Sequence, residues 1–594
     1  MSEIKRQWSR SIYIIIPWAL IVFGYYKLPS PWGANGDYLT TAIFALLTFP
    51  LAGIAILAAT YAGEGSKLYG LKPVYTKLPI VKKPEVHVHF RQKMMWTILA
   101  LIIYMSLTNV FIYGLDKENV IDVFESYRAI LAGASGSLMH LGIGPIVTAS
   151  IIMQLFVGAK IFNLDLGNDE DRAVYQGTQK LLVIIMIFVE AIPQVYGYLK
   201  PSDSFVDMLD KATGHGALLA NTIIVAQLFA GSYLVFLLDE MVSKWGIGSG
   251  ISLFIAAGVS QAIFTGTFNW VPVNPNEPLS VSNPPSGTIP KTIYLLQNSS
   301  AAEVRGGILE RILFANPNPV IALIGTIIIF LVVAYAESTK IELPLAHERA
   351  RGARGRYPIK LMYCSNIPVI LTSALLANIA MWTLLFWSNP TLSKVPILGH
   401  NPWLGKYPTA EQAAEWGIRQ NTPIGGLAYY VSRVNGLGSW LLPLINPNMY
   451  GSYVFYIHTY WQHLAHVVIY FAFMVGFSIL FAKFWIETAN MNARAVAEQI
   501  QRGGMQIPGF RRDPRVLEKI LNRYIPPITI FSGAAVGALA ATADLIGTVG
   551  NASGTGVLLT VGILIQFYEA MGREQLMEMH PVIRQFFETG GRRL

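Results

Sequence analysis

One stretch of the sequence, residues 141–155, is apolar enough for lipid, yet it opens with glycines and a proline and carries Thr148 and Gln154. A short amphipathic piece, residues 120–131, precedes it and leads into a run rich in glycine, alanine and serine. A piece of about 12 residues cannot cross a hydrocarbon core that requires ~20 helical residues. Non-helical backbone at membrane depth persists only where protein or a water-filled cavity surrounds it. The stretch therefore indicates a membrane channel with a segment of its own chain folded into it.

Composition supports a membrane protein with many crossings. Charged residues make up 13% of the 594 residues and hydrophobic residues 53%, whereas soluble domains carry about 25% charged residues. The single cysteine, Cys364, excludes an internal disulfide and a cysteine-rich metal site. The net charge of +9 suits a surface turned towards anionic lipid or RNA.

Long apolar runs predict twelve membrane crossings. These are residues 11–28, 39–62, 94–113, 142–161, 180–198, 217–238, 247–267, 319–336, 367–387, 453–486, 525–549 and 555–571. The 453–486 run is too long for one simple crossing, so we expect it to protrude or to kink.

The distribution of lysine and arginine predicts the orientation of these crossings. Cytoplasmic loops of membrane proteins carry an excess of both residues. The loops 337–360 and 487–524, the segment 67–93 and both chain ends are basic. Successive crossings alternate in direction, and one choice of direction for the first of the twelve places all of these basic segments on the cytoplasmic side. We therefore expect a multi-pass protein of the cell membrane with both termini in the cytoplasm.

Two predicted crossings begin with the same pattern. Ile143 and Val147 lie four residues apart beside glycines, and so do Ile247 and Ile251. A spacing of four puts each pair on one helix face, and the neighbouring small residues let helix backbones approach closely. Two such pairs facing each other would form a dry constriction. Ordinary helix packing is the competing interpretation.

Polar residues inside predicted crossings are the next candidates. A carboxyl group such as that of Glu190 is costly in a membrane and is a functional candidate by default. Asn378 and Thr148 also lie in crossings and could hydrogen-bond with it across helices. The alternative is a packing contact with no moving part. The arginines of residues 349–356 suit phosphate contact, but they are equally explained by topology.

The sequence carries no recognisable catalytic motif, phosphate loop or zinc-binding motif. The pairs His87/His89 and His463/His466 have some metal-like spacing, but we expect neither to bind a metal. We therefore expect no enzymatic activity, no metal and no cofactor. Without an ATP site, the driving force for transport would come from outside the chain.

Several long motifs, in the right order, resemble those of the SecY family, the central subunit of the protein-conducting channel. They are residues 141–155, 171–180, 239–250, 356–360, 365–368 and 523–527. Residues 145–148 and 554–559 are more similar to the archaeal and eukaryotic branch than to the bacterial one. The resemblance covers residue 79 to the C-terminus.

The resemblance implies an all-α polytopic fold, a SecY-like channel of ten helices in two inverted halves. Residues 79–267 and 319–576 would be the two five-helix halves, joined by an external loop at 268–318. Residues 577–594 would be a cytoplasmic tail. The family has no counterpart for residues 1–78, which we expect to add two peripheral transmembrane helices.

The resemblance also implies the function. The chain would pass unfolded secretory polypeptides across the membrane and release transmembrane segments sideways into lipid. The expected partners are SecE-type (gamma) and small beta-type subunits in a heterotrimer, the ribosome, signal sequences and nascent polypeptides, and membrane lipids.

Four sets of residues follow by position from the resemblance. The pore ring would consist of Ile143, Val147, Ile247, Ile251, Ile370 and Leu559. The plug, about residues 122–136, would be a short half-helix including Asp122, Phe124, Tyr127, Ile130, Leu131 and Gly136. The lateral gate would have the polar cluster Thr148, Glu190 and Asn378 between crossings 142–161 and 180–198 on one side and 367–387 and 453–486 on the other. The ribosome would dock on Arg349, Arg351, Arg354, Arg356, Lys360, Arg511, Arg512, Arg515 and Arg523.

Three other classes of protein are conceivable. A secondary transporter also has inverted repeats and broken helices, but it needs paired charges in the membrane, and only Glu190 and Asp544 are candidates. A membrane-embedded enzyme needs a catalytic pair that the sequence does not offer. A non-transporting scaffold with this fold would have lost the ring or gate residues, which are present.

Overall fold

The computed structural model describes residues 67–579, except 80, 87, 117–126, 129, 159–161, 163, 165, 167, 275–276, 300–306, 315–316, 348–353, 390–391, 395–397, 448–452, 503–504 and 507–513. The predicted crossings 11–28 and 39–62 lie outside the described residues. The same holds for part of the predicted plug and of the predicted basic surface, namely Asp122, Phe124, Arg349, Arg351, Arg511 and Arg512.

Ten helices of the described chain correspond to the ten remaining predicted crossings. They are α4 (Phe90–Thr108), α5 (Gly144–Gly158), α6 (Asp169–Gly197), α8 (Gly216–Trp245), α9 (Gly250–Phe268), α13 (Val320–Ser338), α14 (Ile367–Ser388), α20 (Tyr460–Thr488), α22 (Pro514–Ile546) and α23 (Gly554–Met579). Eight of them are long and apolar enough to cross a membrane. The other two are α4 and α5, and α5 has only 15 residues.

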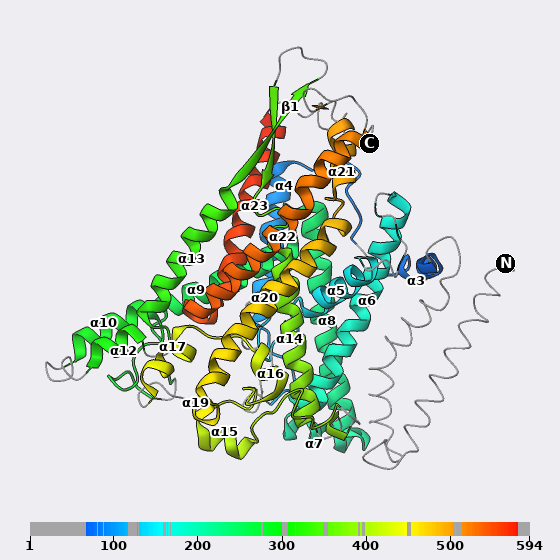
Figure 1. Cartoon of the computed structure of the whole chain (residues 1–594). Coiled ribbons are helices and arrows are strands. Elements are labelled where there is room, and N and C mark those ends of the chain that lie inside the picture. Colours follow the sequence, from blue (N-terminus) through cyan, green and yellow to red (C-terminus); the bar gives the residue numbers. More distant parts are fainter. Residues whose placement is uncertain are drawn as a thin grey trace.

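The helices run between two ends of the molecule that differ in structure (Figure 1). At one end, called here the hairpin end, α21 (Ala493–Arg502) lies near β1 (Lys340–His347) and β2 (Arg354–Lys360). With β3 (Met505–Gln506) these strands form an antiparallel sheet in the order β2-β1-β3.

The regions 337–360 and 487–524, treated above as loops, thus contain regular structure. Apolar residues alternate at Ile341, Leu343 and Leu345, which is the period of a strand. In addition, α22 begins at Pro514, well before the predicted start at residue 525.

The opposite end, called the loop end, gathers short helices from the two long connections (Figure 1). The connection 268–318 contains α10 (Thr288–Asn298) and α12 (Leu309–Phe314). The connection 388–452 contains η4 (Leu392–Lys394), α15 (Ala410–Trp416), α16 (Gly426–Val431) and α17 (Leu437–Ile445). The loop end also includes α7 (Asp203–Thr213) and α19 (Tyr453–Ile457). The break between α19 and α20 confirms that the 453–486 run is not one simple crossing.

The five membrane helices before residue 268 and the five after residue 319 meet along two seams. On one side α5 packs against α14 and α20, and α6 packs against α14; we call this the front seam. On the other side α23 and η5 (Val549–Asn551) pack against α9; we call this the rear seam. The two halves therefore meet at two separate places, on opposite sides of the bundle.

The rear seam depends on glycine. Gly550 has φ +74°, and a Cβ built there would lie 1.8 Å from the carbonyl oxygen of Ala262 on α9. A Cβ at Gly266 would in turn lie 2.3 Å from the Gly550 Cα. Backbones that approach this closely gain van der Waals contact that larger residues would prevent. The rear seam is therefore a fixed contact between the halves.

A strap of the chain, residues 67–83, crosses the ends of α5, α6 and α8. It begins with η1 (Lys67–Leu71) and α3 (Lys72–Tyr75), and Leu68 is buried against α5 and α6. The Tyr69 hydroxyl donates to the Asp171 carboxylate at 2.5 Å, which together with burial raises the pKa of Tyr69 to about 12. The segment that follows residues 1–66 is thus anchored on the front-seam side of the first half.

We predict that Gly550→Ala destabilises the protein by at least about 2 kcal/mol, because alanine both clashes with Ala262 and disfavours a positive φ. Thermal unfolding of the purified protein in detergent measures the effect. The matched control is Gly476→Ala in the middle of α20, where a Cβ would meet nothing within 4 Å. This control should be neutral or slightly stabilising, and equal melting temperatures for both variants would contradict the role of the rear seam.

Candidate pore and lateral gate

The six residues of the predicted pore ring lie near the N-terminal ends of four helices. Ile143 directly precedes α5 and Val147 lies in its first turn, whereas Ile247 lies in the turn before α9 and Ile251 in the first turn of that helix. Ile370 is in the first turn of α14 and Leu559 is in α23. Five of the six are buried, and Ile251 is partly buried against the main core. Four helices, two from each half, thus contribute bulky aliphatic side chains.

Residues 122–126 and 129 of the expected half-helix lie outside the described residues, and residues 130–136 consist of turns and irregular backbone. Tyr127, Ile130 and Leu131 are buried in the main core. The Leu131 carbonyl accepts from the Ile143 N–H at 2.8 Å, so its oxygen is bonded to a residue outside any helix. The backbone of the predicted ring residue Ile143 therefore holds the end of the plug region.

The turn into α5 requires a glycine at position 142. Gly142 has φ +56°, and a Cβ there would lie 2.2 Å from the Leu131 carbonyl oxygen. The Tyr104 hydroxyl of α4 donates to the Ala132 carbonyl at 3.0 Å. Both contacts fix the path of the chain between the plug and the pore.

The three predicted gate residues lie together across the front seam. The Thr148 hydroxyl on α5 donates to Glu190 Oε1 on α6 at 2.9 Å. Asn378 Nδ2 on α14 donates to the Thr148 hydroxyl at 3.0 Å. Gly144 leaves room for the carboxyl group, because a Cβ there would lie 3.1 Å from Glu190 Oε2. One threonine hydroxyl thus links a buried carboxyl group of the first half to an amide of the second half.

The front seam has two further polar contacts that the sequence analysis missed. Gln194 and Tyr198 follow Glu190 at intervals of four on the same face of α6. Gln194 Nε2 lies 3.4 Å from Met381 Sδ on α14. The Tyr198 hydroxyl donates to the Leu384 carbonyl at 2.9 Å. The sequence did hold a signal for these contacts, because the polar residues of α6 recur at intervals of about one helical turn.

Gln194 also connects the gate to the end of the plug. His140 Nδ1 accepts from the Gly136 N–H at 3.0 Å, so the ring proton resides on Nε2. This Nε2 lies 3.1 Å from Gln194 Oε1, to which it donates. Both side chains are fully buried. The residues joining plug and pore are therefore hydrogen-bonded to the front seam.

The described members of the predicted basic surface lie at the hairpin end, on β2 and on the first turns of α22. They are Arg354, Arg356, Lys360, Arg515 and Arg523. Arg523 is exposed. Lys360 Nζ forms an ion pair with Glu569 of α23 at 2.9 Å, so it also holds β2 against the last membrane helix.

The remaining candidate charges and histidines have partners within the chain. Asp544 forms an ion pair with Arg433 at 3.0 Å. His463 lies 3.1 Å from the Tyr429 hydroxyl, and His466 lies 2.9 Å from the Ser432 carbonyl. Among the residues that the structure describes, no group of His, Cys, Asp and Glu could hold a metal.

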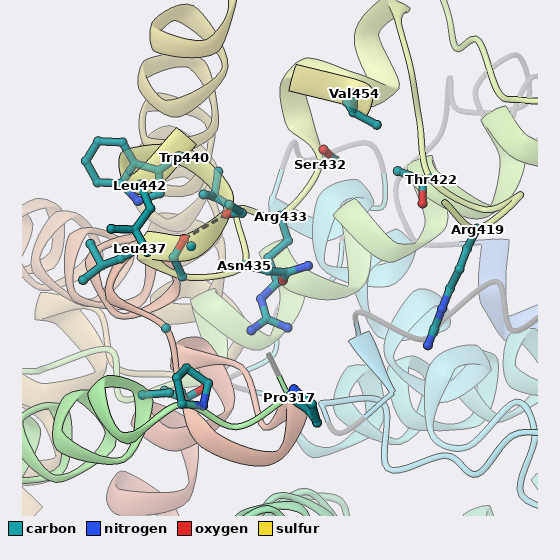
Figure 2. A pocket seen from close by; sticks show the side chains of 18 of the residues that line it. Pro317, Arg419, Thr422, Ser432, Arg433, Asn435, Leu437, Trp440, Leu442 and Val454 are labelled. Atoms are coloured by element: carbon teal, nitrogen blue, oxygen red, sulfur yellow. Dashed lines mark hydrogen bonds between the residues drawn. The ribbon is translucent and has the colours of Figure 1, made fainter. Parts of the chain in front are cut away.

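A cavity of about 800 Å³ opens at the loop end, beside the plug. Its lining includes Tyr127 and polar residues of both long connections. Figure 2 shows Arg419, Thr422 and Arg433 on one side and Pro317 on the opposite side. Tyr127 of the plug region thus lies at the wall of this cavity.

We predict that Gln194→Leu lowers the free energy of unfolding by about 1–3 kcal/mol, because the substitution leaves the buried His140 Nε2 without its acceptor. Thermal unfolding in detergent checks this. Gln227→Leu on α8 is the control, since Gln227 bonds to exposed backbone atoms of Tyr113 and should change stability by less than about 0.5 kcal/mol. A loss for Gln227→Leu as large as for Gln194→Leu would contradict the prediction.

Comparisons with known proteins agree with this geometry. The SecY family model matches residues 137–568, and a model of the plug domain of Sec61p matches residues 102–136. The protein translocase subunit SecY of Archaeoglobus fulgidus is 44% identical over 522 residues, which are 88% of this chain and 98% of the relative. The corresponding subunit of Haloferax volcanii is 40% identical over 520 residues, 87% of this chain and 98% of that protein.

Solved structures agree as well. A structure of a protein conducting channel aligns with a TM-score of 0.64 at 37% identity, covering 86% of this chain and 99% of the other. Sec61 in the canine ribosome-channel complex aligns with a TM-score of 0.62 at 37% identity, again covering 86% and 99%. With this fold, plug region and sequence identity, the chain belongs to the SecY family and is the pore-forming subunit of a protein translocation channel in a membrane.

Proposed function

We propose that Ile143, Val147, Ile247, Ile251, Ile370 and Leu559 form the constriction through which the polypeptide passes. The observation that carries this proposal is that these aliphatic residues lie near the N-terminal ends of four helices, two from each half, with the plug backbone bonded to Ile143. An aliphatic collar dewets when it is empty, which blocks ions. It also makes no specific contacts, which suits a substrate of arbitrary sequence.

We propose further that the front seam is the lateral gate and the rear seam its hinge. The front seam is bridged by Thr148, Glu190 and Asn378 through side-chain hydrogen bonds, whereas glycine backbones interlock at the rear. A hydrogen bond between membrane helices contributes only about 0.6 kcal/mol. A signal sequence that binds better to the open state could therefore open the front seam.

Residues 122–136 would be the plug, which leaves the ring when a polypeptide enters. The cavity at the loop end supports this role, because Tyr127 is part of its lining. The bond between Leu131 and Ile143 is a single backbone contact, which is weak enough to open and close repeatedly.

We propose that the hairpin end faces the cytoplasm, with both termini on that side, and docks a ribosome. The arginines on β2 and α22 support this, because guanidinium groups suit the phosphates of RNA. A structural relative described above is part of a ribosome-channel complex. SecE-type and beta-type subunits would complete the heterotrimer, with signal sequences, nascent chains and lipids as further partners.

Residues 1–78 would form a two-helix extension beside α5 and α6. Support comes from the strap, whose Leu68 is buried against these helices. The second predicted crossing ends at residue 62, five residue steps before Lys67. An extended chain of that length spans at most roughly 18 Å. The extension would therefore lie next to the front seam.

The plug proposal predicts that deleting residues 122–136 makes the channel conduct ions. Purified protein in planar bilayers should give large, flickering openings after the deletion, whereas wild type stays closed, because the collar without the plug closes the channel only intermittently. If both proteins were silent and instead took up a labelled solute, the channel proposal would fail in favour of a transporter.

The gate proposal predicts that Thr148→Val eases opening by about 2–5-fold, through loss of the hydrogen bonds to Glu190 and Asn378. Translocation of a reporter with a weakened signal sequence measures this. Ser150→Ala is the matched control, because Gln179 donates to Ser150 at 2.7 Å and joins α5 only to α6, within one half. An equal gain from Ser150→Ala would argue against a gate at the front seam.

A further inference from the structure

A buried carboxylate at the loop end of α22 is fully hydrogen-bonded. Asp544 is 1% exposed. Its Oδ1 accepts from Arg433 Nε at 3.0 Å and from the Thr555 N–H at 3.2 Å. Its Oδ2 accepts from the Tyr470 hydroxyl at 2.7 Å and from the Thr555 hydroxyl at 2.6 Å. Both oxygens are thus used, and the charge is paired.

The partners of Asp544 come from three elements that differ in their place in the channel. Tyr470 is on α20, which lines the front seam. Thr555 is at the start of α23, four residues before the ring residue Leu559. Arg433 follows α16 in the connection 388–452. One carboxylate therefore ties a gate helix, a pore helix and a loop to the end of α22.

The loop is seated on α22 by its backbone as well. The Gly436 N–H donates to the Asp544 carbonyl at 2.9 Å, and Trp440 Nε1 donates to the Leu545 carbonyl at 3.0 Å. Gly436 has φ +77°, and a Cβ at Gly547 would lie 2.7 Å from its Cα. Residues 432–440, called here the seated loop, thus have a defined position over the membrane helix.

The seated loop also packs beside the plug. Tyr127 and Val434 belong to the same buried hydrophobic cluster, which includes Tyr407. Arg433 and Tyr127 line the same cavity, and Figure 2 labels Arg433 among its lining residues. The residue that pairs with Asp544 therefore lines the same cavity as the plug residue Tyr127.

Burial makes this ion pair an all-or-none contact. The Arg433 and Asp544 side chains are 7% and 1% exposed. A buried charge that loses its partner is strongly destabilising, whereas an intact pair mainly fixes one arrangement of the chain. The seated loop cannot shift by a small amount without separating the two charges. It either holds its position against Tyr127 or leaves it.

We propose that the Arg433–Asp544 pair is an external latch for the plug. It keeps the seated loop against Tyr127, and through Tyr470 it links that position to the gate helix α20. The latch stabilises the closed channel, so breaking it releases the plug without any signal sequence. This inference rests on the proposed plug and gate, and it assigns Arg433 and Asp544 as positioning residues for closure.

The test is ion conductance of the channel, reconstituted in planar bilayers with its accessory subunits. Asp544→Asn removes the negative charge that compensates the buried Arg433 guanidinium, and we expect it to raise the open probability at least about tenfold. Tyr470→Phe and Thr555→Val each remove one hydrogen bond to the carboxylate and should cause smaller increases. They keep the proposal testable if Asp544→Asn does not fold. Asp544→Glu, which keeps the charge, should restore part of the closure.

Two controls separate the latch from other effects. Lys93→Gln breaks the Lys93–Glu574 ion pair, 2.7 Å long and at the hairpin end, and it should leave the channel closed. The deletion of residues 122–136 should conduct strongly. If the deletion conducts while Asp544→Asn and Tyr470→Phe are folded and as closed as wild type, the latch is overturned and the proposed function stands. If the deletion is also silent, the proposed plug itself fails.

A double-variant comparison addresses the pairing directly. Arg433→Met combined with Asp544→Asn removes both charges, so the increases in conductance from the two single changes should not add. Increases that add fully would show that the two residues act independently, which would overturn the latch.

Discussion

The two halves of this channel are held together by contacts of different kinds on their two sides. Inside a membrane there is no hydrophobic force between helices, so packing and hydrogen bonds must hold them. At the rear, Gly550 and Gly266 bring backbones into direct contact. At the front, the contacts with α14 are made by side chains. Thr148 of α5 contacts α14, and so do Gln194 and Tyr198 at the end of α6. Backbone packing resists separation, whereas isolated hydrogen bonds can be exchanged.

The polar residues of the front seam are tolerated in the membrane because they are hydrogen-bonded to one another. A buried carboxyl group such as that of Glu190 costs free energy unless it is bonded. Its bond to Thr148 crosses from α6 to α5, and Asn378 extends the contact to the other half. These polar groups therefore satisfy one another across the front seam.

The plug is connected to the rest of the channel on both of its sides. Towards the front seam, His140 links the residues after the plug to Gln194. Towards the loop end, Tyr127 packs in the same hydrophobic cluster as Val434 of the seated loop. The plug region therefore has contacts both with the front seam and with the external loop.

The sequence by itself determined the ten described membrane helices, the basic segments between them and the polar positions Thr148, Glu190 and Asn378 that meet at the front seam. Hydropathy runs and spacing are local properties, so they can be read without a fold. It could not determine the bond between Leu131 and Ile143, because only the folded chain brings these two backbone groups together. Nor could it pair Asp544 with Arg433, which are 111 positions apart. Only the tertiary structure decides such pairs, since a buried polar group is satisfied by whichever partner the packing brings near.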